Sequence, residues 1–189
     1  MDAEPKVKGT AFRSIDQSFL DLRGEAARTR ALDLMHPEVA ATYRDGLMLA
    51  ASWYPISWYR EVFRAFRAAT NEGAELAHKI GVRSVQIDMK SIYKMLFAKF
   101  VSPQTLLGLS QRLFSTYYDT GQFEVVESQR GYVKVRLSGC VGWDLNMWTE
   151  IVGSCTSLLE IAGAKEVRLR LSSGGKERDT AAEIEAHWI

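Results

Sequence analysis

The stretch Gly121–Leu137, with the sequence GQFEVVESQRGYVKVRL, decides the fold class of this chain of 189 residues. Polar and apolar residues alternate on both sides of Gln129-Arg130-Gly131, and the apolar ones are Phe123, Val125, Val133, Val135 and Leu137. A period of two on either side of a turn that contains glycine predicts a β-hairpin with one buried and one solvated face.

The sequence before Gly121 has the period of helices instead. Ser14-Ile15-Asp16-Gln17 has the S-x-x-Q form of a capping box, which predicts a helix start at Ser14. A second helical pattern runs from Glu25 to Met35 and stops before Pro37. Pro55 suits the first turn of a third helix, whose apolar face would carry Tyr59, Phe63, Phe66 and Thr70.

Further helix boundaries follow from capping residues. Asn71 is expected to start a short helix that Gly81 ends, and Ser84 to start another that runs to Phe100. Ser102-Pro103 combines an N-cap with a proline at the first helical position, so a new helix is expected from there to about Gly121.

The chain after the hairpin has a long helix followed by two more strands. Apolar residues recur at helical steps from Leu145 to Ala162, before Gly163, and alternate over 167–171 and 182–188. The predicted fold class is α+β: an N-terminal helical layer on one face of a four- to five-stranded antiparallel sheet, with a long helix between two C-terminal hairpins. Lys6–Phe12 is the candidate fifth strand. Residues 1–189 are expected to form a single domain, with 1–6 flexible.

Composition excludes several classes of protein. The chain is 47% hydrophobic and 25% charged with a net charge of +1, which is unlike a disordered chain and unlike the basic domains that bind nucleic acid. The longest stretch without charged residues, Gly46–Tyr59, is shorter than the roughly 18 residues of a membrane span. The polar start Met1–Lys6 is unlike a signal peptide, so a cytoplasmic location is expected.

Residues that would bind metals or act as nucleophiles are scattered. Cys140 and Cys155 are isolated, and the three histidines, His36, His78 and His187, lie far apart. No metal site or cofactor is therefore predicted. The segment Ser172–Lys176 has the composition of a phosphate loop, but a plain turn between two strands has the same composition.

Four short motifs carry a family resemblance, namely Val7–Phe12, Ser52–Pro55, Tyr117–Gly121 and Leu158–Ala164. In this order, over roughly Val7 to Trp188, they resemble a myxobacterial (Myxococcus-type) paralogous family of unknown function. The second half is similar to the 4-vinyl-reductase-type small-molecule-binding domain, whose architecture is shared by TRAPP transport subunits and the NO-signalling haem domains. The resemblance implies an apolar cavity between helices and sheet, and in several members a dimer.

The chain departs from these families at residues that would carry chemistry. Domains of the 4-vinyl-reductase type often have two cysteines in the last hairpin, where this chain has Gly174 and Ala182. The histidine and the Tyr-x-Ser-x-Arg run of the haem domains are also absent. The resemblance therefore implies a fold and a kind of pocket but no reaction.

The candidate ligand or interface residues are aromatic or apolar. One group lies between Trp53 and Tyr59, and another lies on a helix from Ile87 to Phe100 that is apolar on more than one face, so it either lines a cavity, closes the core or forms a dimer interface. The candidates are Trp53, Tyr54, Trp58, Tyr59, Tyr93, Leu96, Phe97, Phe100 and Tyr117. Arg60, Arg64 and Arg67 form a basic row that would contact an anionic partner or simply face solvent.

These features favour a non-catalytic signalling or regulatory module that holds an apolar small molecule or a partner protein where the helices meet the sheet. The alternative is a homodimeric scaffold subunit without a ligand. An enzyme would have to use groups that are remote from other catalytic residues, such as Glu183, Glu185 and His187. These three residues share the solvated face of a predicted strand, and the ordinary alternation of polar and apolar residues explains that arrangement without any catalytic role.

Overall fold

The computed structural model describes residues 3–91 and 102–189. Helices and strands follow each other along the chain as β1 Lys6–Lys8, α1 Gly9–Arg23, α2 Glu25–Asp33, α3 Pro37–Arg44, β2 Trp53–Pro55, α4 Ile56–Thr70, α5 Glu75–Ser91, α7 Pro103–Tyr117, β3 Gln122–Gln129, β4 Tyr132–Ser138, α8 Leu145–Ile161, β5 Arg168–Gly174 and β6 Ala182–His187.

The predicted fold class is confirmed. Four antiparallel strands form one sheet in the order β3-β4-β6-β5, and α8 connects its two hairpins. The candidate fifth strand lies elsewhere, because β1 pairs with β2 in a separate two-stranded sheet, where Val7 is opposite Tyr54. The rest of Lys6–Phe12 belongs to α1, which begins at Gly9.

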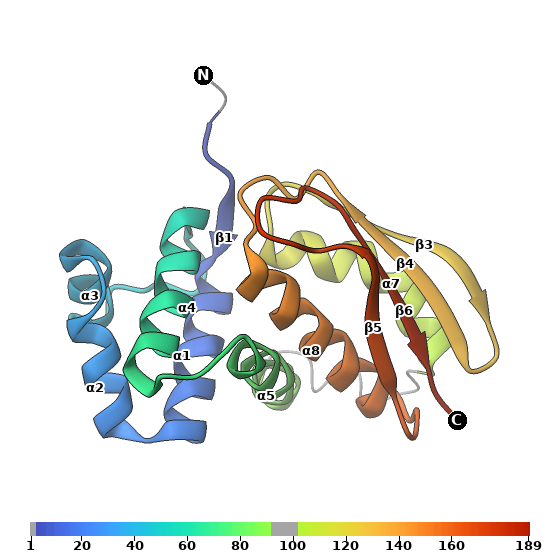
Figure 1. The fold of residues 1–189 in the computed structure, drawn as a ribbon, viewed down its shortest axis with the longest axis horizontal. Helices are drawn as coiled ribbons and strands as arrows, with labels where there is room; N and C mark the ends of the chain where they lie inside the picture. Colours follow the sequence, from blue (N-terminus) through green and yellow to red (C-terminus); the bar gives the residue numbers. More distant parts are fainter. Residues whose placement is uncertain (1–2, 92–101) are drawn as a thin grey trace.

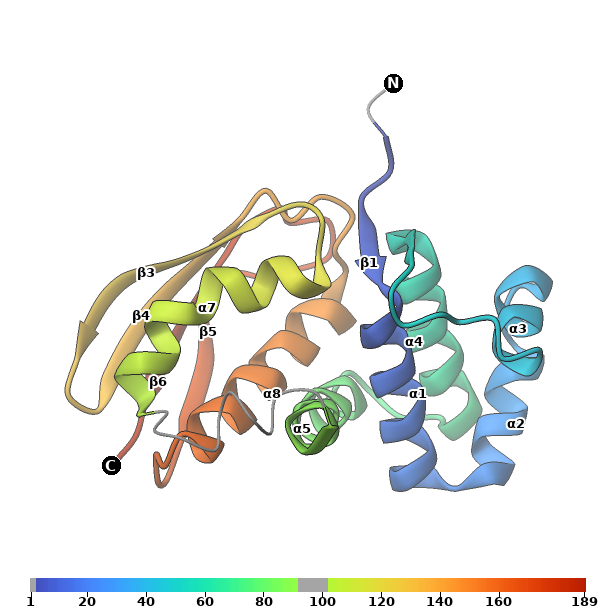
Figure 2. The same ribbon diagram turned by 180° about the vertical axis from the view of Figure 1, so that it is seen from behind.

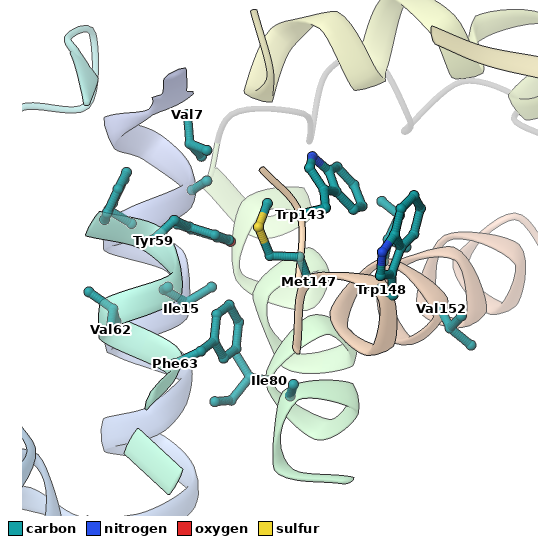
Figure 3. Packing of buried hydrophobic residues seen from close by; sticks show 14 of the residues in the cluster. Val7, Ile15, Tyr59, Val62, Phe63, Ile80, Trp143, Met147, Trp148 and Val152 are labelled. Atoms are coloured by element: carbon teal, nitrogen blue, oxygen red, sulfur yellow. The ribbon is translucent and has the colours of Figure 1, made fainter. Parts of the chain in front are cut away.

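The elements form layers that can be followed in Figures 1 and 2. Helices α7 and α8 cover one face of the sheet, and α5 lies between α8 and α1. Helix α4 stands beside α1, and α2 and α3 stand beyond them, at the end of the molecule away from the sheet. Tyr59 and Phe63 of α4 point toward α5 and α8, where Ile80 and Met147 lie (Figure 3). The helical layer and the sheet are thus joined through α5 and α8.

The sheet has the predicted two faces. Val133, Val135 and Leu137 of β4 are buried against the helices, whereas the residues between them carry ion pairs on the outer face. Cross-strand pairs of this kind join Lys134 and Arg136 to Glu183 at 2.8 Å and Arg170 to Glu185 at 2.7 Å. Alternation along the strands therefore separates an apolar interior from a charged surface.

Helices α5 and α8 cross through two glycines. A Cβ atom on Gly81 would lie 2.2 Å from the carbonyl oxygen of Glu150, and a Cβ atom on Gly153 would lie 2.2 Å from that of His78. Each glycine thus admits the backbone of the other helix. No residue with a side chain fits at either position without moving one helix.

Three predicted helix boundaries are wrong, and they share one cause. Helix α5 runs without a break through both Gly81 and Ser84, and α1 continues through Ser14. Gly81 was expected to end a helix, but it is the contact point with α8. Ser14 and Ser84 were expected to cap helix starts, but both side chains are buried and hydrogen bonded to side chains of other helices. Helix interiors that contact other helices thus resemble helix ends in sequence.

Among the other helix boundaries, the prediction at Ser102 is confirmed and the prediction at Asn71 is wrong. Ser102 caps α7 as predicted, since its Oγ accepts a hydrogen bond from the Thr105 amide at 3.3 Å. Asn71 ends α4 in a left-handed conformation, with φ of 54°, instead of starting the next helix. Helix α3, with Pro37 in its first turn, was not predicted at all.

Replacing Gly81 with alanine tests the crossing of α5 and α8. We expect Gly81→Ala to lower the free energy of unfolding by about 1–3 kcal/mol, because the added methyl group would force the helices apart. Gly108 of α7 is the matched control: nothing lies within 4 Å of its Cβ position, so Gly108→Ala should raise stability by about 0.5–1 kcal/mol. Urea denaturation measures both. Equal effects of the two substitutions would contradict the crossing.

Candidate functional site

A cavity of about 130 Å³ lies in the core between the helices and the sheet. Its wall includes residues of α1, α4, α5, α7 and α8 and the inner face of all four strands of the main sheet. Most of the lining is aliphatic or aromatic, as with Val135, Ile184 and Phe114. Seven polar side chains of the described lining form two groups, one around Asp88 and one around Glu150.

The first group centres on Asp88 of α5, which is only 5% exposed. Its carboxylate accepts hydrogen bonds from the Ser14 hydroxyl of α1 and, at 2.7 Å, from the Tyr117 hydroxyl of α7. Ser84, one turn earlier on α5, is hydrogen bonded to Ser18 at 2.9 Å. Burial raises the pKa of Asp88, and the hydrogen bonds from Ser14 and Tyr117 oppose that rise. Asp88 therefore holds three helices at one point of the wall.

The second group centres on Glu150 of α8, which is also 5% exposed. Its Oε1 accepts a hydrogen bond from the Ser154 hydroxyl at 2.8 Å, and its Oε2 accepts one from the Tyr118 hydroxyl at 3.4 Å. Burial raises the pKa of Glu150 to about 7. This carboxyl group is therefore divided between its neutral and charged forms at physiological pH.

Among the predicted ligand or interface residues that the structure describes, Tyr59 and Tyr117 lie in the cavity wall. Trp53, Tyr54 and Trp58 lie outside it: Tyr54 and Trp58 stack at 5.7 Å, and Trp53 packs under the ammonium group of Lys8 at 4.5 Å. The cluster is split because β2 ends at Pro55, so only the α4 side that carries Tyr59 turns inward.

The remaining aromatic and apolar candidates, Tyr93, Leu96, Phe97 and Phe100, lie outside the described residues. Helix α5, Glu75–Ser91, which precedes them in the chain, packs between α1 and α8. The homodimer based on this helix stays a prediction.

The basic row borders a different feature, an open groove of about 600 Å³ between α4 and the start of α8. Arg64 pairs with Glu61 at 2.6 Å, and Arg67 donates to the Asn146 side chain at 3.0 Å. Arg60 also lines the groove, together with four acidic residues, Glu61, Glu72, Asp144 and Glu177. With acids interleaved in this way, the groove has no excess of positive charge to favour an anion.

The residues that an enzyme was expected to use do not form a site. Glu183, Glu185 and His187 are absent from the described cavity wall. Glu183 and Glu185 are held in the ion pairs of the outer sheet face, and their basic partners lower the pKa of both carboxyl groups. Among the described residues, no group of three His, Cys, Asp or Glu side chains could hold a metal ion.

Sequence reasoning missed the polar residues of the cavity, and the sequence does carry a signal for one of them. Helix α8 is buried around most of its circumference, and Glu150 is the only charged residue in it before Glu160. A lone acid in the middle of an apolar helix is buried when the whole helix is buried. Asp88 carries no comparable signal, because charged residues surround it on α5.

Comparison with solved structures places this fold among the H-NOX domains. An H-NOX protein from K. algicida in its unliganded Fe(II) state superposes with a TM-score of 0.72 at 15% identity, over 96% of both chains. An oxygen-binding H-NOX domain related to soluble guanylate cyclases gives 0.68 at 10% identity, over 96% of this chain and 94% of the other. A structure described in terms of haem redox potential and porphyrin distortion gives 0.70 at 10% identity, with the same coverage. At these identities the likeness shows the fold.

The family expected from the short motifs is not supported. No family model and no curated protein matches the chain, and its structural neighbours are H-NOX domains instead of 4-vinyl-reductase-type or TRAPP-like proteins. The motifs lie at junctions: Val7–Phe12 joins β1 to α1, and Leu158–Ala164 ends α8. Turn and capping residues recur at such junctions in unrelated proteins, which explains the misleading myxobacterial resemblance.

The described cavity does not fit a histidine-ligated haem. None of the three histidines lines it: His36 is exposed near α3, His187 lies on the end of β6, and His78 is on α5 outside the wall. Cys155 does line it, and burial raises the pKa of its thiol to about 12, so the thiol is neutral without a metal. The described wall also lacks any Lys or Arg to neutralise haem carboxylates, and it carries two carboxyl groups of its own.

Haem titration tests this disagreement between fold and residues. Adding haemin to the purified protein should give no sharp Soret band of a histidine-ligated complex, and reduction with added carbon monoxide should give no ligand-shifted spectrum. A haem-containing H-NOX domain measured in parallel provides the positive control. A stoichiometric Soret band that survives gel filtration would contradict this assignment of the cavity.

The raised pKa of Glu150 predicts a pH-dependent stability. The unfolded state ionises near 4.5 and the folded state near 7, so stability is lost as pH rises through this window and levels off above it. Glu150→Gln removes that loss. Its advantage over the natural chain should be near zero at pH 4 and should grow to at most about 3 kcal/mol at pH 8. Urea denaturation at several pH values measures the difference, and a difference that does not change with pH would contradict the burial of a neutral Glu150.

Proposed function

We propose that this chain is a non-catalytic sensor or regulatory module that binds a small organic molecule in its core cavity without haem. The observation that carries the proposal is the cavity itself, about 130 Å³, with apolar walls and a few polar groups that converge from four helices. Ligand sites in proteins have this composition: apolar walls give affinity, and a few polar groups fix orientation.

The fold supports the signalling part of the proposal. The neighbours of this fold include an oxygen-binding domain related to soluble guanylate cyclases, so this architecture holds a small ligand in at least one other protein. A cavity in contact with α1, α4, α5, α7, α8 and the sheet touches most layers of the molecule. A ligand that repacks this cavity would therefore change the position of the helices relative to the sheet, and a partner protein would detect that change.

The polar groups modify the expectation of an apolar ligand. An entirely apolar molecule would leave the carboxyl groups of Asp88 and Glu150 facing a hydrocarbon surface, which costs free energy when such groups are buried. The ligand proposed here has an apolar body and a polar end. No described helix is long and apolar enough to cross a membrane, and the cytoplasmic location stays a prediction.

Benzene is a suitable first probe, because an apolar cavity of about 150 Å³ in another protein binds benzene. We expect benzene to raise the melting temperature of the natural chain and to shift amide resonances of cavity residues such as Val85 and Leu159 in NMR spectra. Cys155→Met fills part of the cavity and should reduce both effects, whereas Glu160→Met, exposed on the same helix, should not. Shifts confined to surface residues, or none at all, would refute a binding cavity.

A further inference from the structure

The charge of the cavity narrows the chemical class of its ligand. Among the described residues, Glu150 receives hydrogen bonds from Ser154 and Tyr118 only, and no described Lys, Arg or His forms an ion pair with it. Buried carboxylates in proteins are normally paired with a cation or hold a metal. Glu150 thus lacks the positively charged partner that its ionised form requires.

The surroundings of Glu150 would accept a cation. Asp88 faces the same cavity from the opposite helix and adds further negative potential, which also raises the pKa of Glu150. The rings of Tyr59, Phe114 and Tyr118 line the wall, and aromatic faces attract ammonium groups. An anionic ligand, in contrast, would meet two carboxyl groups and no described base.

The size of the cavity limits the rest of the ligand. At about 130 Å³ it is slightly smaller than the cavity of about 150 Å³ that accommodates benzene in another protein. One ring with at most a short chain is therefore the largest ligand that fits without movement of the walls, with the ring against Val133, Val135 and Ile184 of the sheet. A second ring would require the walls to move.

We propose that the cavity selects small primary amines with a single ring, whose ammonium group pairs with Glu150 while the ring packs on the inner face of the sheet. This inference rests on the proposed function, since it names the class of ligand for the same cavity. It also explains why a carboxyl group is buried in the apolar helix α8. The Glu150 carboxylate would discriminate between ligands of equal size by their charge.

Pairing with an ammonium group couples binding to a proton. The titratable groups that face Glu150 are Tyr59 from α4, Asp88 from α5, Tyr118 after α7 and Cys155 from α8. Burial keeps the two tyrosines and the cysteine neutral near pH 7, so Glu150 is the group that must lose its proton. Amine binding should release a proton near pH 6, and affinity should fall about tenfold per pH unit well below 7.

The test is isothermal titration calorimetry at pH 8 with three probes of nearly equal size: 2-phenylethylamine, 2-phenylethanol and phenylacetate. The amine should bind at least about tenfold more tightly than the alcohol, and phenylacetate should not bind measurably. Glu150→Gln should remove the preference for the amine and leave alcohol binding within about threefold of its original value. Glu160→Gln, at the exposed end of α8, should leave all three affinities unchanged.

Two outcomes separate this inference from the proposed function. Equal or tighter binding of the alcohol, or an amine preference that survives in Glu150→Gln, overturns the amine assignment while the cavity still binds small molecules. Failure of all three probes together with failure of benzene overturns both. The comparison of the amine, the alcohol, phenylacetate and benzene uses the natural chain alone. It therefore still tests the inference if the Glu150→Gln variant does not fold.

Discussion

The crossing of α5 and α8 through Gly81 and Gly153 is the contact on which the rest of the structure depends. Each glycine admits the backbone of the facing helix, so the two helix axes approach more closely than any pair of side chains would allow. Helix α5 carries Asp88 and contacts α1, while α8 carries Glu150 and contacts the sheet. The crossing therefore joins the helical end of the molecule to its sheet and brings two carboxyl groups to one cavity.

The strands and the long helix could be predicted because their environment is simple. Val133, Val135 and Leu137 alternate with charged residues since one face of the sheet contacts helices and the other contacts water. Ser102 predicts a helix start correctly because its side chain bonds within its own segment. Wherever one residue interacts mainly with its neighbours in sequence or with water, the pattern in the sequence is sufficient.

Most of the residues that line the cavity could not be predicted from the sequence, because their side chains contact distant parts of the chain. Ser14 and Ser84 look like helix caps, yet their hydroxyl groups bond across helices to Asp88 and Ser18. Gly81 looks like a helix end, yet it fits the backbone of α8. Trp53 and Tyr54 of β2 and Trp58 of α4 look like pocket residues, yet none of them lies in the described wall. For the two serines and the glycine, the role of the residue depends on a partner more than 35 positions away in the sequence. For the aromatic residues, it depends on which side of the strand or helix faces the cavity. Neither can be read from the neighbouring residues in the sequence.

The likeness to H-NOX domains and the content of the cavity have to be read together. A fold is compatible with many ligands, because function depends on the few side chains that face the site. Here the described side chains include two carboxyl groups and no histidine, so the same architecture is suited to a different ligand. A core cavity in contact with both the helical layer and the sheet is what the proposed small-molecule sensor requires.

A crystal structure of the protein grown with 2-phenylethylamine tests the central claim most directly. The account predicts electron density for one ring inside the core cavity, with the amine nitrogen within hydrogen-bond distance of the Glu150 carboxylate and with the backbones of α5 and α8 still in contact at Gly81 and Gly153. Density for the amine only on the surface, or a core cavity closed by side chains with Glu150 turned away from it, would contradict the account.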